Sequence, residues 1–74
     1  MEEKLSWKIG KEIKEARKKM NLTQKNLAKD IDISRNYLSD IECGRYIPSV
    51  EKLLALSNKL NIDLNLFKND VNTR

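Results

Sequence analysis

The sequence predicts an all-α fold, a single domain over residues 1–74 with five helices. Apolar residues recur three and four positions apart along most of the chain, as they do on the buried face of a helix. Hydroxyl residues that can cap a helix precede these stretches, and Gly44 and the single proline separate them. Because 74 residues have room for only one small hydrophobic core, we expect no second domain.

The first helix is expected to begin at Ser6, as its cap, and to end at Met20. Its apolar face consists of residues with spacings of four, three and four, namely Ile9, Ile13, Ala16 and Met20. Asn21 follows, and asparagine tolerates the left-handed conformation that commonly ends a helix. This helix is therefore expected to supply one wall of the core.

Two short helices separated by a tight turn are predicted over residues 23–43. Thr23 and Ser34 are their cap candidates, and Gly44 ends the second helix. Asp32 lies in the turn, where the backbone needs a residue that tolerates a positive φ. Because helices this short are marginal alone, the first must brace the second, which presents polar side chains outward.

The C-terminal helices are expected over residues 49–68. Ser49 is the predicted cap of the first of them. Its expected inner face comprises Val50, Leu53, Leu56, Ser57 and Leu60. Asn61 interrupts this pattern, and a fifth helix of one to two turns, capped by Asp63, is expected to carry Leu64 and Phe67.

The composition favours a cytoplasmic protein. No apolar run approaches the roughly 20 residues that span a bilayer, and the first residues lack the apolar segment of a signal peptide. The single cysteine cannot form an internal disulfide. The net charge is +4, and residues 1–46 hold 11 Lys and Arg against 8 Asp and Glu. This excess suits a phosphate-bearing partner, although a solvated surface is the simpler explanation of charge alone.

The residue types argue against an enzyme. The chain has no histidine, so the commonest general base and metal ligand is absent. One cysteine and scattered carboxylates do not make a metal site, and two glycines do not make a phosphate-binding loop. We therefore expect no catalytic residues, no metal and no cofactor.

The pattern resembles the helix-turn-helix domain of the lambda-repressor/Cro (Xre) family over residues 9–67. The residues that carry this resemblance are Arg17, Leu22, Thr23, Gln24, Leu27, Ala28, Ile33, Ser34, Leu38, Ser39, Ile41, Glu42, Gly44, Pro48 and Ser49. The resemblance implies a transcriptional regulator that binds a palindromic operator in double-stranded DNA as a homodimer, with RNA polymerase as a further partner. Its recognition helix, residues 34–43, would enter the major groove. Phage-type repressors and restriction–modification controllers are the members that it resembles most.

Four residues on that helix are predicted to read bases: Arg35, Asn36, Ser39 and Asp40. The guanidinium of Arg35 matches O6 and N7 of guanine, and the amide of Asn36 matches N6 and N7 of adenine. Asp40 can accept a hydrogen bond from N4 of cytosine, orient Arg35 or lie at the rim of the interface.

Six further residues are predicted to contact phosphates: Thr23, Gln24, Ser34, Tyr37, Arg45 and Tyr46. Thr23 and Gln24 lie at a helix N-terminus, where free N–H groups attract an anion. The resemblance implies that Gln24 also braces a base-reading side chain. Cys43 departs from the family pattern, in which a polar or basic residue is common, and this departure puts a phosphate contact there in doubt.

Two structural features complete these expectations. The resemblance implies that Arg17 pairs with Glu42 and ties the first helix to the recognition helix, the alternative being two unpaired surface charges. Three apolar residues fall off the expected inner faces, namely Trp7, Leu54 and Leu66. They indicate either ordinary surface exposure or a homodimer patch.

Two alternatives to a stand-alone DNA-binding regulator remain at this point. One is a protein-interaction module, such as an antitoxin with a helix-turn-helix domain, which would need a long apolar or disordered tail. The short tail over residues 68–74 argues against it. The other is a fragment of a longer regulator.

Overall fold

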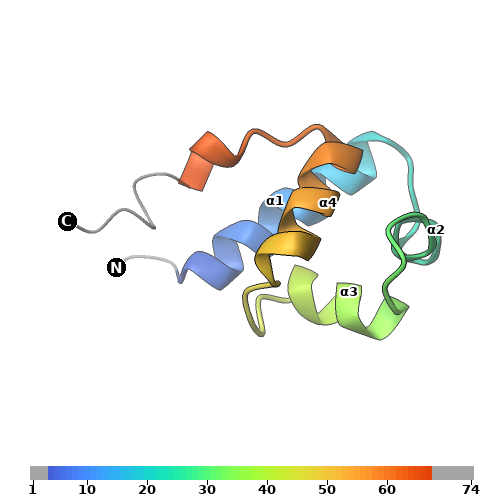
Figure 1. Ribbon diagram of the computed structural model, residues 1–74, viewed down its shortest axis with the longest axis horizontal. Coiled ribbons are helices and arrows are strands. Elements are labelled where there is room, and N and C mark those ends of the chain that lie inside the picture. The colour runs from blue at the N-terminus through green and yellow to red at the C-terminus, as the bar shows by residue number, and fades with distance from the viewer. Residues whose placement is uncertain (1–3, 68–74) are drawn as a thin grey trace.

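The computed structural model describes residues 4–67, which form four α-helices and one 3-10 helix and contain no strand (Figure 1). The α-helices are α1 (Leu5–Lys19), α2 (Gln24–Asp30), α3 (Arg35–Glu42) and α4 (Val50–Leu60). A short 3-10 helix, η1, follows at Leu64–Phe67. The tail over residues 68–74 and the side chain of Leu66 lie outside the described part of the chain.

The all-helical fold is confirmed, but the prediction of five regular helices is not. The segment expected to be the fifth helix forms only the four residues of η1. Asp63 does cap it, because its Oδ1 accepts a hydrogen bond from the backbone N–H of Asn65 at 2.9 Å. Helical runs this short commonly take the tighter 3-10 geometry.

Local signals place the helix ends correctly in the middle of the chain. The hydroxyls of Thr23 and Ser34 accept hydrogen bonds from the backbone N–H groups three residues later, both at 3.0 Å. Asp32 lies in the turn between α2 and α3 with a φ of 61°, and Gly44 follows α3 with a φ of 77°. The two helices of the predicted helix-turn-helix therefore begin and end where the sequence indicates.

The prediction that Ser6 caps the first helix is wrong. The residue at the cap position of α1 is Lys4, whose side chain makes no capping hydrogen bond. Ser6 lies inside the helix, and its hydroxyl donates instead to the carbonyl oxygen of Gly44 at 2.9 Å. The hydroxyl therefore joins α1 to the end of α3, a contact that no local pattern reveals.

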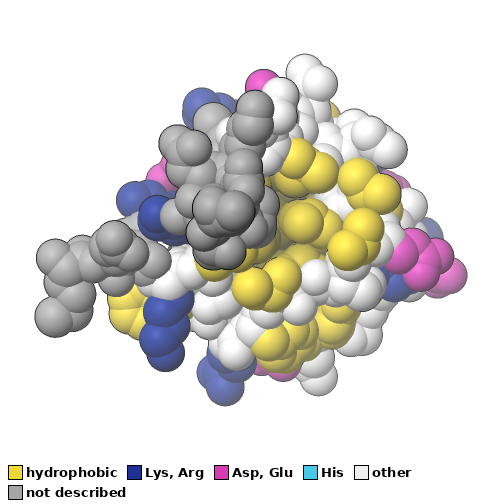
Figure 2. Space-filling model, turned by 60° about the vertical axis from the view of Figure 1, so that its left-hand side comes forward, with side chains coloured by type: hydrophobic (Ala, Val, Ile, Leu, Met, Phe, Trp, Pro, Cys, Tyr) yellow, Lys and Arg dark blue, Asp and Glu magenta, His cyan; other side chains and the backbone are white. Residues whose placement is uncertain are grey.

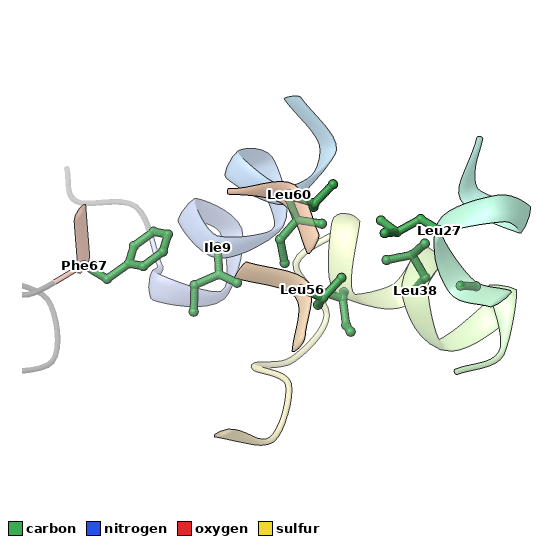
Figure 3. Close-up of a cluster of buried hydrophobic side chains, with 9 residues drawn as sticks. Ile9, Leu27, Leu38, Leu56, Leu60 and Phe67 are labelled. Atoms are coloured by element: carbon green, nitrogen blue, oxygen red, sulfur yellow. The ribbon is translucent and has the colours of Figure 1, made fainter. Parts of the chain in front are cut away.

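The core lies where α1, α3 and α4 meet, with α2 closing one end (Figures 1 and 3). The fully buried side chains of this core are Ile13, Leu27, Leu38, Ile41 and Leu56. In Figure 3, Phe67 of η1 points toward Ile9 of α1 at the opposite end of the cluster. The 3-10 segment thus extends the core beyond the four α-helices.

The ends of two predicted inner faces are exposed. Val50 is 73% exposed and Met20 is 46% exposed, although both were expected to face the core. Val50 is the first residue of α4 and Met20 follows the last residue of α1, so both lie at helix ends. The expectation holds for the middle of each helix and fails where the neighbouring helix no longer covers it.

Gly10 allows a close approach between α1 and the end of α3. A Cβ at this position would lie 2.3 Å from the carbonyl oxygen of Ile41 and 2.9 Å from that of Glu42. Both are backbone atoms, so they cannot rotate away. The backbone of α1 therefore rests directly on the end of α3 because residue 10 has no side chain.

Within residues 4–67, every helix is too short or too polar to cross a lipid bilayer.

Candidate nucleic-acid interface

The outer face of α3 carries the predicted base-reading residues. Arg35 and Asn36 are exposed in the first turn of α3, and Ser39 is half-buried one turn later. Within the described residues, none of these three side chains has a hydrogen-bond or ion-pair partner. The opposite face of α3 is held in the core by Leu38 and Ile41. The helix thus presents unengaged polar groups on a fixed support.

Asp40, the fourth predicted base reader, has a partner that the sequence did not indicate. Its Oδ1 lies 3.2 Å from Nε of Arg45, which follows the end of α3. The backbone N–H of Arg45 also donates to the carbonyl oxygen of Asp40 at 3.1 Å. The carboxylate therefore orients the guanidinium of Arg45, rather than that of Arg35 as one alternative had it.

Two tyrosines border this ion pair. The rings of Tyr37 and Tyr46 lie 5.6 Å apart between centroids, with an angle of 32° between their planes. Desolvation, followed by the charge of Asp40 and the neighbouring Tyr37, raises the pKa of the Tyr46 phenol. A tyrosine hydroxyl is protonated at neutral pH even without such a shift, so it can donate a hydrogen bond to a phosphate.

The start of α2 lies next to the start of α3. A shallow hollow between them is lined by Arg17, Leu22, Thr23, Gln24, Lys25 and Arg35. The N-terminus of α2 opens into this hollow with partial positive charge, and the two cationic side chains of Lys25 and Arg35 add to it. The arrangement is suited to a phosphate group.

Gln24 and Ser34 have structural partners as well as predicted phosphates. The side-chain Nε2 of Gln24 donates to Oε1 of Glu42 at 3.1 Å. The hydroxyl of Ser34 accepts the capping hydrogen bond at the start of α3. Thr23 does the same for α2. These hydrogen bonds therefore fix the starts of α2 and α3 and hold α2 against α3.

Arg17 and Glu42 form the polar centre of the fold. Nε of Arg17 donates to Oε2 of Glu42 at 2.7 Å, and Nη2 donates to Oε1 at 3.1 Å. Nη1 of Arg17 donates to the carbonyl oxygen of Leu22 at 2.8 Å. The two side chains are only 11% and 3% exposed. This bidentate pair joins α1, α3 and the loop before α2.

The three residues of the predicted dimer patch do not share one environment. Trp7 is 56% exposed, but it lies against Gly44, where an added Cβ would be 2.3 Å from its Cδ1. Leu54 lies on α4 and is 48% exposed. The side chain of Leu66 is outside the described part of the chain.

Two further exposed apolar side chains precede Leu54 along the chain. Val50 lies one turn before it on α4 and Ile47 lies in the preceding loop, and both are exposed. Ile47 was not predicted to be a surface apolar residue of note, and Val50 was expected to face the core. Figure 2 shows how hydrophobic side chains gather on one face of the molecule. We call Ile47, Val50 and Leu54 the α4 patch.

Comparison with known proteins finds a helix-turn-helix family and several named regulators. The helix-turn-helix family matches residues 13–67. The chain is 48% identical over 61 residues to the ImmF control region 10 kDa protein of Bacillus phage phi105, covering 82% of this chain and 68% of that one. It is 45% identical over 56 residues to the immunity repressor protein of the same phage, covering 76% of this chain and 39% of the repressor. It is 40% identical over 68 residues to the HTH-type transcriptional regulator ImmR of Bacillus subtilis, covering 89% of this chain and 54% of ImmR. The chain thus spans about half of ImmR and less than half of the immunity repressor.

Proposed function

The chain belongs to the lambda-repressor/Cro-like (Xre-type) helix-turn-helix family of DNA-binding transcriptional regulators, and on this premise we propose that it binds a palindromic operator as a homodimer. In this proposal α3 enters the major groove and the protein represses transcription by occupying a promoter. One relative above is named an immunity repressor and another an ImmF control region protein, both from the same Bacillus phage. These names support a role in phage immunity.

The observation that carries the proposal is the contrast between the two faces of α3. Arg35, Asn36 and Ser39 are unengaged on one face, while Glu42 and the core residues of the other face hold the helix rigidly. Eight residues at about 1.5 Å each give α3 a length of about 12 Å. An α-helix with its side chains is about 10–12 Å in diameter and the major groove of B-DNA is about 12 Å wide, so α3 fits into it.

Phosphate contacts in the proposal flank α3 on two sides. On one side lie Thr23 and Gln24 at the start of α2, next to Lys25. On the other side lie Arg45, oriented by Asp40, and Tyr46. Contacts of this kind fix the position and register of the protein on the duplex without reading its sequence.

The dimer in the proposal forms through the α4 patch. Val50 and Leu54 lie one turn apart on α4 and Ile47 lies in the loop before it; all three are exposed, and exposed apolar side chains favour association. A two-fold dimer brings the same patch of each protomer against its copy, and it places two recognition helices for two half-sites. RNA polymerase remains a further proposed partner at a promoter.

The first test is selection of bound duplexes from a random DNA pool at near-physiological salt. We expect an enriched palindrome whose half-sites are about one helical turn apart, about 34 Å. Enrichment of a single half-site would retain α3 as the reading element and refute the dimer. Weak, salt-sensitive binding without enrichment would refute sequence-specific recognition.

The second test is a charge in the α4 patch. Leu54→Glu should leave the circular dichroism spectrum unchanged but convert the dimer to a monomer in analytical ultracentrifugation. The same selection carried out with this variant should then yield half-sites only. An unchanged palindrome would mean that the dimer forms elsewhere.

A further inference from the structure

A second hollow lies beside the C-terminal end of α3, between that end and α1. It is lined by Trp7, Lys11, Lys14, Glu42 and Cys43. The three residues from α1 are spaced by four and three positions, so they lie along one face of that helix. Lys11, Lys14 and Cys43 are all exposed. None of the DNA contacts proposed above involves a residue that lines this hollow.

The hollow is held in shape by the contacts between α1 and the end of α3. The hydroxyl of Ser6 donates to the carbonyl oxygen of Gly44 at 2.9 Å. The backbone at Gly10 rests on the last carbonyl groups of α3, and Arg17 binds Glu42 one turn beyond Lys14. The lysines are therefore carried on a helix whose position relative to α3 is fixed.

The charges in this hollow favour an anion. The guanidinium of Arg17 compensates the charge of the Glu42 carboxylate, which also accepts a hydrogen bond from the uncharged amide of Gln24. The last turn of α3 contains no basic residue of its own. Among the described residues, Lys11 and Lys14 have no carboxylate partner. Their two full positive charges outweigh the partial negative charge, about half an elementary charge, that the carbonyl groups give the C-terminal end of α3.

The position of the hollow relates it to the DNA-facing surface. The cluster of Arg17, Gln24 and Glu42 lies between this hollow and the first one, because Arg17 and Gln24 line the first and Glu42 lines the second. The first hollow lies at the start of α3 and the second at its end. Because α3 is only about 12 Å long, when its first turn meets the bases its last turn lies within about 12 Å of them, within reach of the sugar-phosphate backbone that borders the groove.

We propose that this second hollow binds the phosphodiester backbone of the operator, with Lys11 and Lys14 as its ligands. The inference rests on the proposed function and adds a contact from α1 to it. The α1 lysines supply the positive charge that the uncharged Cys43 does not. Because the contact is to the backbone, it contributes affinity and salt dependence without sequence preference.

The test compares two variants with the same change in net charge. Lys11→Gln/Lys14→Gln removes the two proposed ligands, whereas Lys19→Gln/Lys52→Gln removes two lysines elsewhere. Lys19 lines a separate hollow between the ends of α1 and α4, and Lys52 lies on α4. Affinity for the selected operator and for a random duplex is measured by fluorescence anisotropy over a range of salt concentrations.

We expect the first variant to bind both duplexes about five- to fiftyfold more weakly at 0.1 M salt and to reduce the slope of log K against log salt by about two. The control variant should bind each duplex within about twofold of the wild-type affinity and leave the slope unchanged, because long-range charge is largely screened at this ionic strength. Equal losses in the two variants would show an effect of overall charge and overturn the proposal. An unchanged affinity, with or without a lower melting temperature, would also overturn it.

The single tryptophan gives a second readout in the wild-type protein. Trp7 lines the hollow and is 56% exposed, so bound DNA should shield it from quenching by acrylamide. Unchanged quenching in the saturated complex would overturn the proposal even if the lysine variants lost affinity. If the wild-type protein does not bind DNA at all, the proposed function itself fails, which the anisotropy of the wild type shows before any variant is compared.

Discussion

Two ion pairs of similar length join separate helices in this molecule, in two regions of opposite character. Arg17 and Glu42 lie 2.7 Å apart between α1 and α3, with side chains 11% and 3% exposed. Lys59 and Asp30 lie 3.1 Å apart between α4 and α2, with side chains 39% and 40% exposed. The first pair is bidentate and has further partners, whereas the second is a single contact in water. Burial, rather than distance, should decide what each pair contributes.

The largest effect is expected from Glu42→Ala. This variant leaves the guanidinium of Arg17 buried without its carboxylate, which typically costs about 3–5 kcal/mol of folding free energy. For a small domain that is a large part of the total stability, so urea denaturation followed by circular dichroism should show a much lower midpoint. The double variant Arg17→Met/Glu42→Leu should recover part of the loss, because no buried charge remains. A loss below about 1 kcal/mol in Glu42→Ala would place this pair with the exposed one.

The next effect is expected from Gly10→Ala in the same region. Helix propensity alone would make alanine more stable by about 1 kcal/mol. The new Cβ would instead collide with the carbonyl oxygens of Ile41 and Glu42, and overpacking of this kind costs about 1–3 kcal/mol. Thermal unfolding should therefore show a decrease, while the exposed control Lys18→Ala stays within about 0.5 kcal/mol of the wild type. An increase in stability would mean that α1 and α3 are not in backbone contact.

Arg35→Ala tests whether the exposed face of α3 contributes to DNA binding without contributing to the stability of the fold. Because Arg35 is exposed and unpaired, its removal should change the folding free energy by less than about 0.5 kcal/mol. Binding to the selected operator should weaken by about 1–3 kcal/mol, with relaxed preference at one base pair. Equal losses on operator and random DNA for Arg35→Ala would mean that Arg35 contacts phosphates only.

Gln24→Ala should weaken binding to all DNA sequences alike, because Gln24 is proposed to contact a phosphate rather than a base. The same anisotropy titrations with operator and random duplexes measure this, and a loss confined to the operator would contradict the assignment.

The smallest effect is expected from Lys59→Ala in the second region. Exposed pairs contribute about 0–1 kcal/mol, and salt screens them. The difference in urea midpoint from the wild type should be small at low salt and vanish at 1 M sodium chloride. A loss comparable to that of Glu42→Ala would refute the distinction between the two regions.

The features that were predictable from the sequence are those set by neighbouring residues. Thr23 and Ser34 cap helices through N–H groups three residues away, and Asp32 and Gly44 take the positive φ that their positions require. These interactions are complete within one turn of chain, so a short pattern specifies them.

The features that were missed depend on contacts between distant segments. Ser6 has a partner 38 residues away, and no spacing within α1 indicates it. Val50 has the periodicity of a core residue but lies where no helix covers it. Asp40 was considered against bases and Arg35, while Arg45 lies beside it only because the chain turns at Gly44. The pairing of Arg17 with Glu42 came from the family resemblance rather than from the residues themselves.

The separation between the two faces of α3 has a consequence for evolution. The side chains that hold α3 in place are Glu42 and the buried Leu38 and Ile41, whereas Arg35, Asn36 and Ser39 take no part in holding the fold together within the described residues. Substitutions at the exposed Arg35 and Asn36 can therefore accumulate at little thermodynamic cost, since exposed unpaired side chains contribute little to stability, whereas the half-buried Ser39 has less freedom to change. Under the proposed function, a lineage would exchange one operator for another by changing a few codons on this face of α3 while the scaffold stays the same.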